Sequence, residues 1–109
     1  MIELVDRVES TQLGLCLDVG HANLCSVIPL EEWVERMGKR LCHVHLHDNN
    51  GQTDDHLPVG QGNIDFDRFF DALFRYVPDV TVSIEVIAEP GVVVENVRHV
   101  REKYMLEYS

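Results

Sequence analysis

Residues 41–48 read LCHVHLHD, and their alternation is the strongest indication of the architecture. Three histidines alternate with cysteine, valine and leucine. Because successive side chains of a β-strand point to opposite faces, a strand here places the histidines on one face and the apolar residues on the other. The apolar face is then suited to pack against helices, and the histidine face to carry chemistry.

Two further segments have strand character and polar ends. Residues 13–19 form a near-continuous apolar run, which is typical of a parallel strand covered by helices. Residues 81–86 alternate between polar and aliphatic side chains. The polar face of the three strands ends in Asp18, His45 and Glu85.

Helical segments alternate with these strands. Apolar residues recur at helical spacing over residues 2–9, 29–39 and 65–77, and again from Pro90 onward, where Val93, Val97, Val100 and Tyr104 share one side. Asp65 is expected to cap the third helix. The order α-βα-βα-βα predicts one α/β domain over residues 1–109, with a parallel sheet and right-handed crossovers.

Composition excludes several classes of function. The 109 residues carry a formal net charge of −10, which repels phosphate backbones and argues against a nucleic-acid partner. No segment approaches the ~20 apolar residues of a membrane span, and the N-terminus lacks the pattern of a signal peptide. Cys16, Cys25 and Cys42 are an odd number without CxxC spacing, and Cys16 and Cys42 lie in apolar runs as small hydrophobes. These features predict a cytoplasmic protein.

The polar strand ends form a candidate metal site. In a parallel barrel, active sites lie at the carboxyl ends of the strands. Two carboxylates and an imidazole there, from Asp18, Glu85 and His45, suit a divalent ion such as zinc or manganese. Asp18 alone is as readily explained as a turn cap. Glu85 is harder to explain without a partner, because burying a carboxylate in an apolar strand is costly.

The remaining histidines have structural explanations. His43 is interpreted as a hydrogen-bonded interior histidine, and His47 as an exposed strand end. His99 is expected on a solvated helix face, beside a basic neighbour. The phenylalanine stripe of the third helix is interpreted as core.

Four motifs occur in a characteristic order: residues 17–21 (LDVGH), 43–49 (HVHLHDN), 54–66 (DDHLPVGQGNIDF) and 84–85 (IE). Together they resemble the sugar phosphate isomerase/epimerase family of the xylose isomerase-like TIM barrel superfamily, which shares its fold with endonuclease IV. By this resemblance the chain is the C-terminal part of a (β/α)₈ barrel. Its three strands are then the sixth, seventh and eighth.

The resemblance implies roles for individual residues. Asp18, His45 and Glu85 are ligands of a divalent metal ion (Mn, Zn, Co or Mg), and Glu85 is also a catalytic acid/base. His21 is catalytic and contacts substrate in the epimerases, or holds a second metal in the nucleases. Asp54 and His56 meet the substrate in the epimerases and hold another metal in the nucleases.

The resemblance also implies what this chain lacks. The family draws a further glutamate ligand from strand five, and a whole barrel needs roughly 200 residues. We therefore expect a partial chain whose bare sheet edges are covered by a homo-oligomer or by a missing N-terminal segment. With a full site, the chemistry would be 1,2-isomerisation or epimerisation beside the carbonyl of a sugar or sugar phosphate.

Three hypotheses follow for function. The first is a metal-dependent sugar isomerase or epimerase. The second is an endonuclease IV-like DNA-repair nuclease, against which the acidic charge argues. The third is a non-catalytic barrel fragment that assembles as an oligomer.

Overall fold

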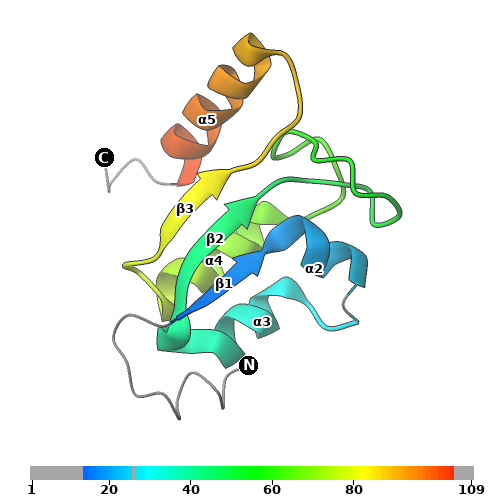
Figure 1. The fold of residues 1–109 in the computed structure, drawn as a ribbon. Helices are drawn as coiled ribbons and strands as arrows, with labels where there is room; N and C mark the ends of the chain where they lie inside the picture. Colours follow the sequence, from blue (N-terminus) through cyan, green and yellow to red (C-terminus); the bar gives the residue numbers. More distant parts are fainter. Residues whose placement is uncertain (1–13, 26, 105–109) are drawn as a thin grey trace.

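A computed structural model of the protein describes residues 14–25 and 27–104. Three parallel strands form a sheet in the order β1-β2-β3, and each strand is followed by a helix (Figure 1). The elements in chain order are β1 (Leu15–Asp18), α2 (Val19–Cys25), α3 (Leu30–Met37), the 3₁₀ turn η1 (Gly38–Arg40), β2 (Leu41–Leu46), α4 (Phe66–Tyr76), β3 (Thr81–Ile84) and α5 (Pro90–Tyr104). The helix expected over residues 2–9 lies outside the described residues.

The alternating α/β order and the parallel sheet predicted from the sequence are confirmed. Two short elements were not predicted, the helix α2 directly after β1 and the turn η1 before β2. The helix α2 is short and contains glycine and asparagine, which are poor helix formers. Its helical conformation therefore depends on packing against the sheet, which a local pattern does not reveal.

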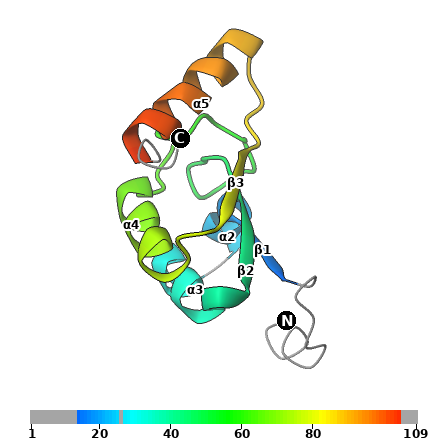
Figure 2. The ribbon, with the colours of Figure 1, turned by 90° about the vertical axis from the view of Figure 1, so that its left-hand side faces the viewer.

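Within the described part of the chain, helices cover one face of the sheet and leave the other open. The helices α3 and α4 lie on the same side of the sheet (Figure 2). Leu17, Val44 and Leu46 are buried in the cluster that also contains Phe69 and Phe70 of α4. Strand alternation thus places the aliphatic residues toward the helices, as the sequence predicts.

The helix α4 carries the aromatic part of this core. The side chain of Asp65 accepts a hydrogen bond from the backbone N–H of Arg68 at 3.1 Å, so the predicted N-cap is confirmed. Phe66, Phe69 and Phe70 are buried, and their rings contact one another edge-on or tilted. The phenylalanine stripe is therefore core, as expected.

The helix α5 buries Val100 and packs Tyr104 against the core, as predicted, but leaves Val97 of the predicted side exposed. Val97 is 44% exposed, whereas Asn96 is buried. The side-chain oxygen of Asn96 accepts a hydrogen bond from the backbone N–H of Val59 at 2.9 Å, and its side-chain nitrogen donates to the Val59 carbonyl at 3.2 Å. The expectation for Val97 is wrong because the adjacent Asn96 takes the inward position, where its side chain hydrogen-bonds to buried loop backbone.

The open face carries small and polar residues. The two ring nitrogens of His43 contact the hydroxyls of Thr81 at 2.6 Å and Ser83 at 2.8 Å, so His43 is hydrogen-bonded as expected. It is half-buried on this face rather than interior, so that part of the interpretation is wrong. Cys16 and Cys42 are free, as expected, but both are exposed and do not act as small hydrophobes of the core. Cys16 alternates with the buried leucines of β1, which places its thiol on the open face.

Along residues 14–25 and 27–104, no helix has the length and apolar character needed to cross a membrane.

Replacing Phe69 by alanine tests this description of the core. The ring is fully buried among apolar neighbours, so Phe69→Ala should lower the free energy of unfolding by about 3–5 kcal/mol. The control is Tyr76→Ala on the same helix, whose side chain is 40% exposed, with an expected loss below about 1 kcal/mol. Urea denaturation followed by circular dichroism measures both values. Equal losses for the two variants would contradict the described core.

Candidate metal centre

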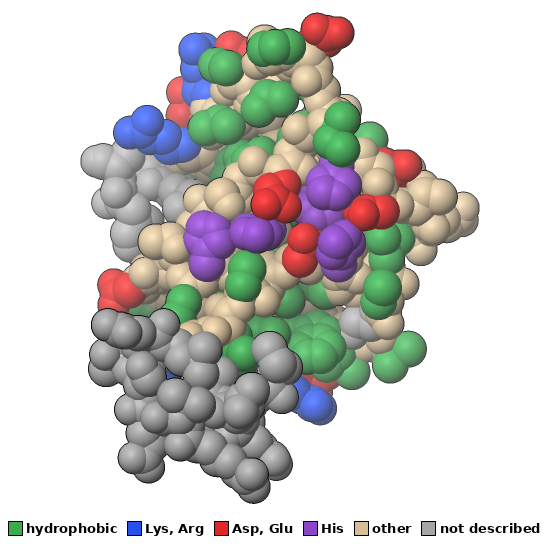
Figure 3. Space-filling view, viewed as in Figure 1, with side chains coloured by type: hydrophobic (Ala, Val, Ile, Leu, Met, Phe, Trp, Pro, Cys, Tyr) green, Lys and Arg blue, Asp and Glu red, His purple; other side chains and the backbone are tan. Residues whose placement is uncertain are grey.

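The carboxyl ends of the three strands bring the predicted metal ligands to one edge. Asp18 is the register partner of His45 across β1 and β2. Glu85 directly follows β3, and its N–H donates to the carbonyl of Leu46 at 2.8 Å. The Glu85 carboxylate oxygen lies 3.2 Å from Nδ1 of His45. Histidine and acidic side chains gather on this open face of the molecule (Figure 3).

His47 is completely buried, and the expectation of an exposed strand end is wrong. Its Nε2 lies 2.6 Å from the Asp18 carboxylate, and its ring stacks on that of His56 with centroids 3.9 Å apart. The backbone of Gly20 covers the ring closely, because a β-carbon at that position would collide with it. Gly20 lies two residues after Asp18, and a glycine at this position indicates that another group, here the His47 ring, approaches the backbone closely.

Donor atoms converge in two groups among the described residues, within 4.8 Å of one another in each group. The first group is Asp18, His47 and Glu85, and the second is His21, His47, Asp54 and His56. His47 belongs to both groups, whereas His45 belongs to neither. Ligation by His45 therefore stays a prediction, and the geometry adds His47 as a second histidine at the same edge.

The buried carboxylate of Asp48 fixes the loop that supplies Asp54 and His56. It accepts backbone N–H hydrogen bonds at 2.8–3.2 Å from four residues: Asn49, Gly60, Gly62 and Ile64. Gly62 permits this arrangement, since a β-carbon there would collide with the Asn49 carbonyl. The loop after β2 is thereby folded back over the strand edge.

The orientation of His56 is set by its backbone and by one hydrogen bond. Its φ of 50° lies in the left-handed region, which is uncommon for a residue other than glycine. Its Nδ1 donates to the Glu85 carbonyl at 2.7 Å. A carbonyl only accepts, so the proton is on Nδ1, and in the neutral ring Nε2 is left bare. Nε2 lies 3.3 Å from the Asp54 carboxylate.

His21 joins two carboxylates at the rim. Its backbone N–H donates to Asp18 at 2.9 Å, and its Nε2 lies 2.9 Å from Asp54. The hydrogen bond with Asp54 raises the pKa of His21, and the neighbouring Asp18 charge adds to the effect. The same hydrogen bond lowers the pKa of Asp54.

These residues fit a divalent metal ion. The donors are imidazole nitrogens and carboxylate oxygens, the mixture that zinc, manganese and cobalt accept. The Nδ1 atom of His47 is buried and has no hydrogen-bond partner among the described residues. A buried ring nitrogen that lies near carboxylates and has no hydrogen-bond partner is in an environment typical of a metal ligand.

The comparisons with known proteins agree with this geometry. The family model described as xylose isomerase-like TIM barrel matches residues 1–103. The chain belongs to this family. Its three βα units correspond to part of a TIM barrel, because the crystal structure of a D-tagatose 3-epimerase-like protein superimposes with a TM-score of 0.78. That protein is 35% identical in sequence, and the match covers 98% of this chain and 39% of that one.

Two further proteins are similar to this chain over shorter spans. The uncharacterized protein MJ1311 of Methanocaldococcus jannaschii is 40% identical over 87 residues, which are 78% of this chain and 29% of that protein. The uncharacterized protein y4fM of Sinorhizobium fredii is 40% identical over 70 residues, 64% of this chain and 22% of that protein. This chain thus spans between 22% and 39% of the lengths of these three proteins.

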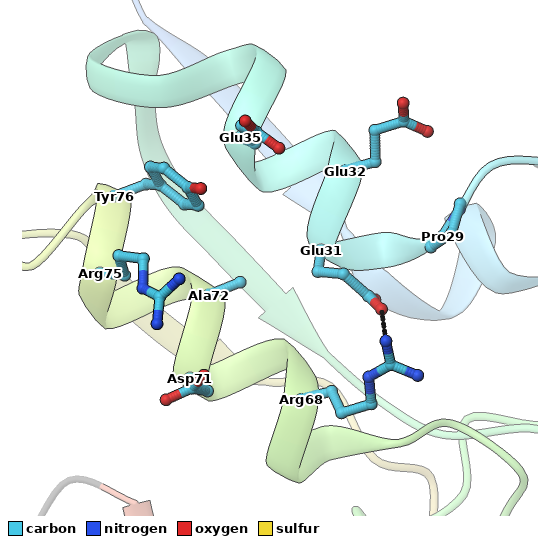
Figure 4. Close-up of a pocket in the computed structure, with 9 residues that line it drawn as sticks. All are labelled: Pro29, Glu31, Glu32, Glu35, Arg68, Asp71, Ala72, Arg75 and Tyr76. Carbon is cyan, nitrogen blue, oxygen red and sulfur yellow. Dashed lines mark ion pairs between the residues drawn. The ribbon is translucent and has the colours of Figure 1, made fainter.

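A groove of about 570 Å³ lies between α3 and α4, in the helical layer (Figure 4). Glu31 and Arg68 face each other across it in an ion pair of 3.2 Å. Its charged side chains are of both signs, and it contains no histidine. The convergent donors of the strand edge make that edge, rather than this groove, the candidate site.

Replacing Asp54 by asparagine tests the electrostatics of the rim. Loss of the carboxylate removes the main cause of the raised pKa of His21, so the pKa of His21 should fall in Asp54→Asn. Asp55→Asn is the matched control, since Asp55 accepts from the Thr53 hydroxyl instead. NMR titration of the metal-free protein measures the pKa of His21. An unchanged value in Asp54→Asn would contradict the described pair.

The same pair has a defined effect on stability. Because the pKa of His21 is raised in the folded state, its protonation stabilises the fold at acid pH. This contribution is lost as the pH rises through the folded-state pKa.

Proposed function

We propose that this chain carries the carboxyl-edge part of the active site of a divalent-metal-dependent sugar isomerase or epimerase. The observation that carries the proposal is the convergence of Asp18 and Glu85 with a histidine ring at the carboxyl ends of parallel strands. In TIM barrels that edge is where active sites form. Similarity to a D-tagatose 3-epimerase-like protein supports sugar chemistry.

The metal ion would be held by Asp18 and Glu85, with His45 as the histidine ligand that the family resemblance assigns. His45 is the register partner of Asp18 in the sheet, and its Nδ1 lies 3.2 Å from the Glu85 carboxylate. An ion bound here would supply Lewis-acid polarisation of a substrate carbonyl. The mixed nitrogen and oxygen donors suit Mn, Zn or Co, with Mg a further candidate.

In this proposal Glu85 moves the proton. Its side chain is 41% exposed on the open face, so a bound sugar can reach the carboxylate. Removing a proton from the carbon next to a carbonyl, and returning it, interconverts isomers or epimers. A positioned carboxylate contributes about 10²–10⁴-fold to the rate of such steps. His45 fixes the orientation of the Glu85 carboxylate from the neighbouring strand.

His21 is the rim residue best placed to contact substrate. Its side chain is 55% exposed, whereas those of Asp54 and His56 are 43% and 20% exposed. A sugar or sugar phosphate supplies hydroxyls that can hydrogen-bond to the His21 ring. Asp54 and His56 lie behind it, where the family places either a substrate contact or a further metal ion.

A second candidate function is metal-dependent DNA cleavage. It is favoured by the convergence of His21, Asp54 and His56, the residues that hold a metal in the nuclease branch. The net charge of −10 disfavours binding of a phosphate backbone. Cleavage of DNA that contains an abasic site would support the nuclease over the isomerase.

The first test of the proposed metal site is metal content. Purified protein dialysed after loading with Mn²⁺ or Zn²⁺ is measured by mass spectrometry, and Asp18→Ala should lose about one ion per chain. Asp55→Ala is the control, because Asp55 lies outside both donor groups. Equal metal content in Asp18→Ala and wild type would contradict the proposed site.

The second test addresses the reaction. A ketose incubated in D₂O with the metal-loaded chain should take up deuterium next to its carbonyl, and NMR measures the rate. Glu85→Gln should slow this exchange by about 10²–10⁴-fold, while the exposed Glu89→Gln leaves it unchanged. Exchange that survives Glu85→Gln would exclude the proposed acid/base. Metal binding without any exchange would favour the non-catalytic fragment.

A further inference from the structure

A chain of three hydrogen bonds on the open face fixes the direction of the Ser83 hydroxyl. At its start, the Thr81 hydroxyl donates to the Cys42 carbonyl at 3.1 Å. A hydroxyl has a single proton, so the contact of 2.6 Å between Thr81 and Nδ1 of His43 is donated by the ring. In the neutral ring Nε2 is then an acceptor, and the Ser83 hydroxyl donates to it at 2.8 Å.

The oxygen of Ser83 is left as an acceptor. Its proton is directed at His43, and along residues 14–25 and 27–104 no group donates a hydrogen bond to this oxygen. The side chain is half-buried, so a small molecule on the open face can reach it. A polar atom with unused lone pairs in such a position is suited to a hydrogen-bond donor of a ligand.

Ser83 lies in the same row of the sheet as two of the proposed metal ligands. It is the register partner of His45, and His45 is the register partner of Asp18. Register partners on neighbouring parallel strands point to the same face, and the strands are about 4.8 Å apart. Ser83 therefore borders the proposed metal site, two residues before Glu85 on the same strand.

The surroundings of Ser83 select a ligand group that donates. The carboxylates of Asp18 and Glu85 at this edge only accept hydrogen bonds when ionised, and they repel anions. The Ser83 oxygen likewise cannot donate while its proton is bound to His43. A sugar hydroxyl can donate to such an acceptor, whereas a phosphate oxygen without a proton cannot.

We propose that Ser83 is a substrate-binding residue whose oxygen accepts a hydrogen bond from a free hydroxyl of the ketose. His43 and Thr81 are its positioning residues, because they hold the Ser83 proton away from the substrate. The family resemblance assigns a role to none of the three. The inference rests on the proposed function and narrows its substrate to a sugar that carries a free hydroxyl at the position that reaches Ser83.

Sugar binding to the whole, metal-loaded chain tests the subsite. The probes are the ketohexoses D-fructose and D-tagatose and their monodeoxy analogues, and NMR titration measures each affinity. For wild type, removal of one particular hydroxyl should weaken binding by roughly three- to tenfold, because one hydrogen bond is lost. Ser83→Ala should weaken binding of the parent ketose by the same factor and cause no further loss for that analogue. Thr53→Ala is the control, since its hydroxyl is exposed and donates to Asp55.

The positioning role of His43 has its own test. His43→Leu frees the proton of Ser83, so the affinity for the parent ketose should fall as in Ser83→Ala. His43→Gln offers a side-chain oxygen that can accept this proton, and it should restore the affinity. A loss of the same size in both His43 variants would overturn the positioning role.

Failure of the subsite can be told apart from failure of the proposed function. Unchanged ketose affinity in Ser83→Ala, or an equal loss for the parent sugar and every analogue, would overturn the subsite and leave the proposed function standing. Metal-loaded chain that binds none of these sugars would overturn both.

Discussion

The site depends on the burial of one carboxylate, that of Asp48. A buried charge is tolerated only when hydrogen bonds replace its lost hydration, and here four backbone N–H groups from one loop do so. This interaction ties the loop after β2 to the strand end from which it departs. Asp54 and His56 are carried by that loop, so their approach to Asp18 and Glu85 follows from how Asp48 is satisfied.

The sequence predicts the layers of the fold and the edge of the sheet where the candidate site lies. Alternation in β2 separates apolar from histidine faces, and the cap at Asp65 is a local signal. His47 and Val97 were assigned incorrectly because the environments of His47 and of the neighbouring Asn96 come from distant segments. The ring of His47 is covered by Gly20 and His56, and Asn96 pairs with loop backbone. Tertiary contacts of this kind have no periodicity that a local pattern can show.

The two donor groups share one imidazole, that of His47. His47 holds Asp18 through one nitrogen and faces Asp54 with the other. His21 likewise bridges Asp18 and Asp54 at the rim. Replacing the carboxylate of Asp18 or of Asp54 therefore alters the contacts of both donor groups. The chain spans 39% of the D-tagatose 3-epimerase-like protein it resembles.

The most direct test of the central claim is an anomalous diffraction map from crystals of the chain grown with Mn²⁺. The account predicts a peak within coordination distance of the carboxylates of both Asp18 and Glu85, at the carboxyl edge of the sheet. Well-ordered Asp18 and Glu85 side chains without such a peak, in crystals saturated with Mn²⁺, would contradict it.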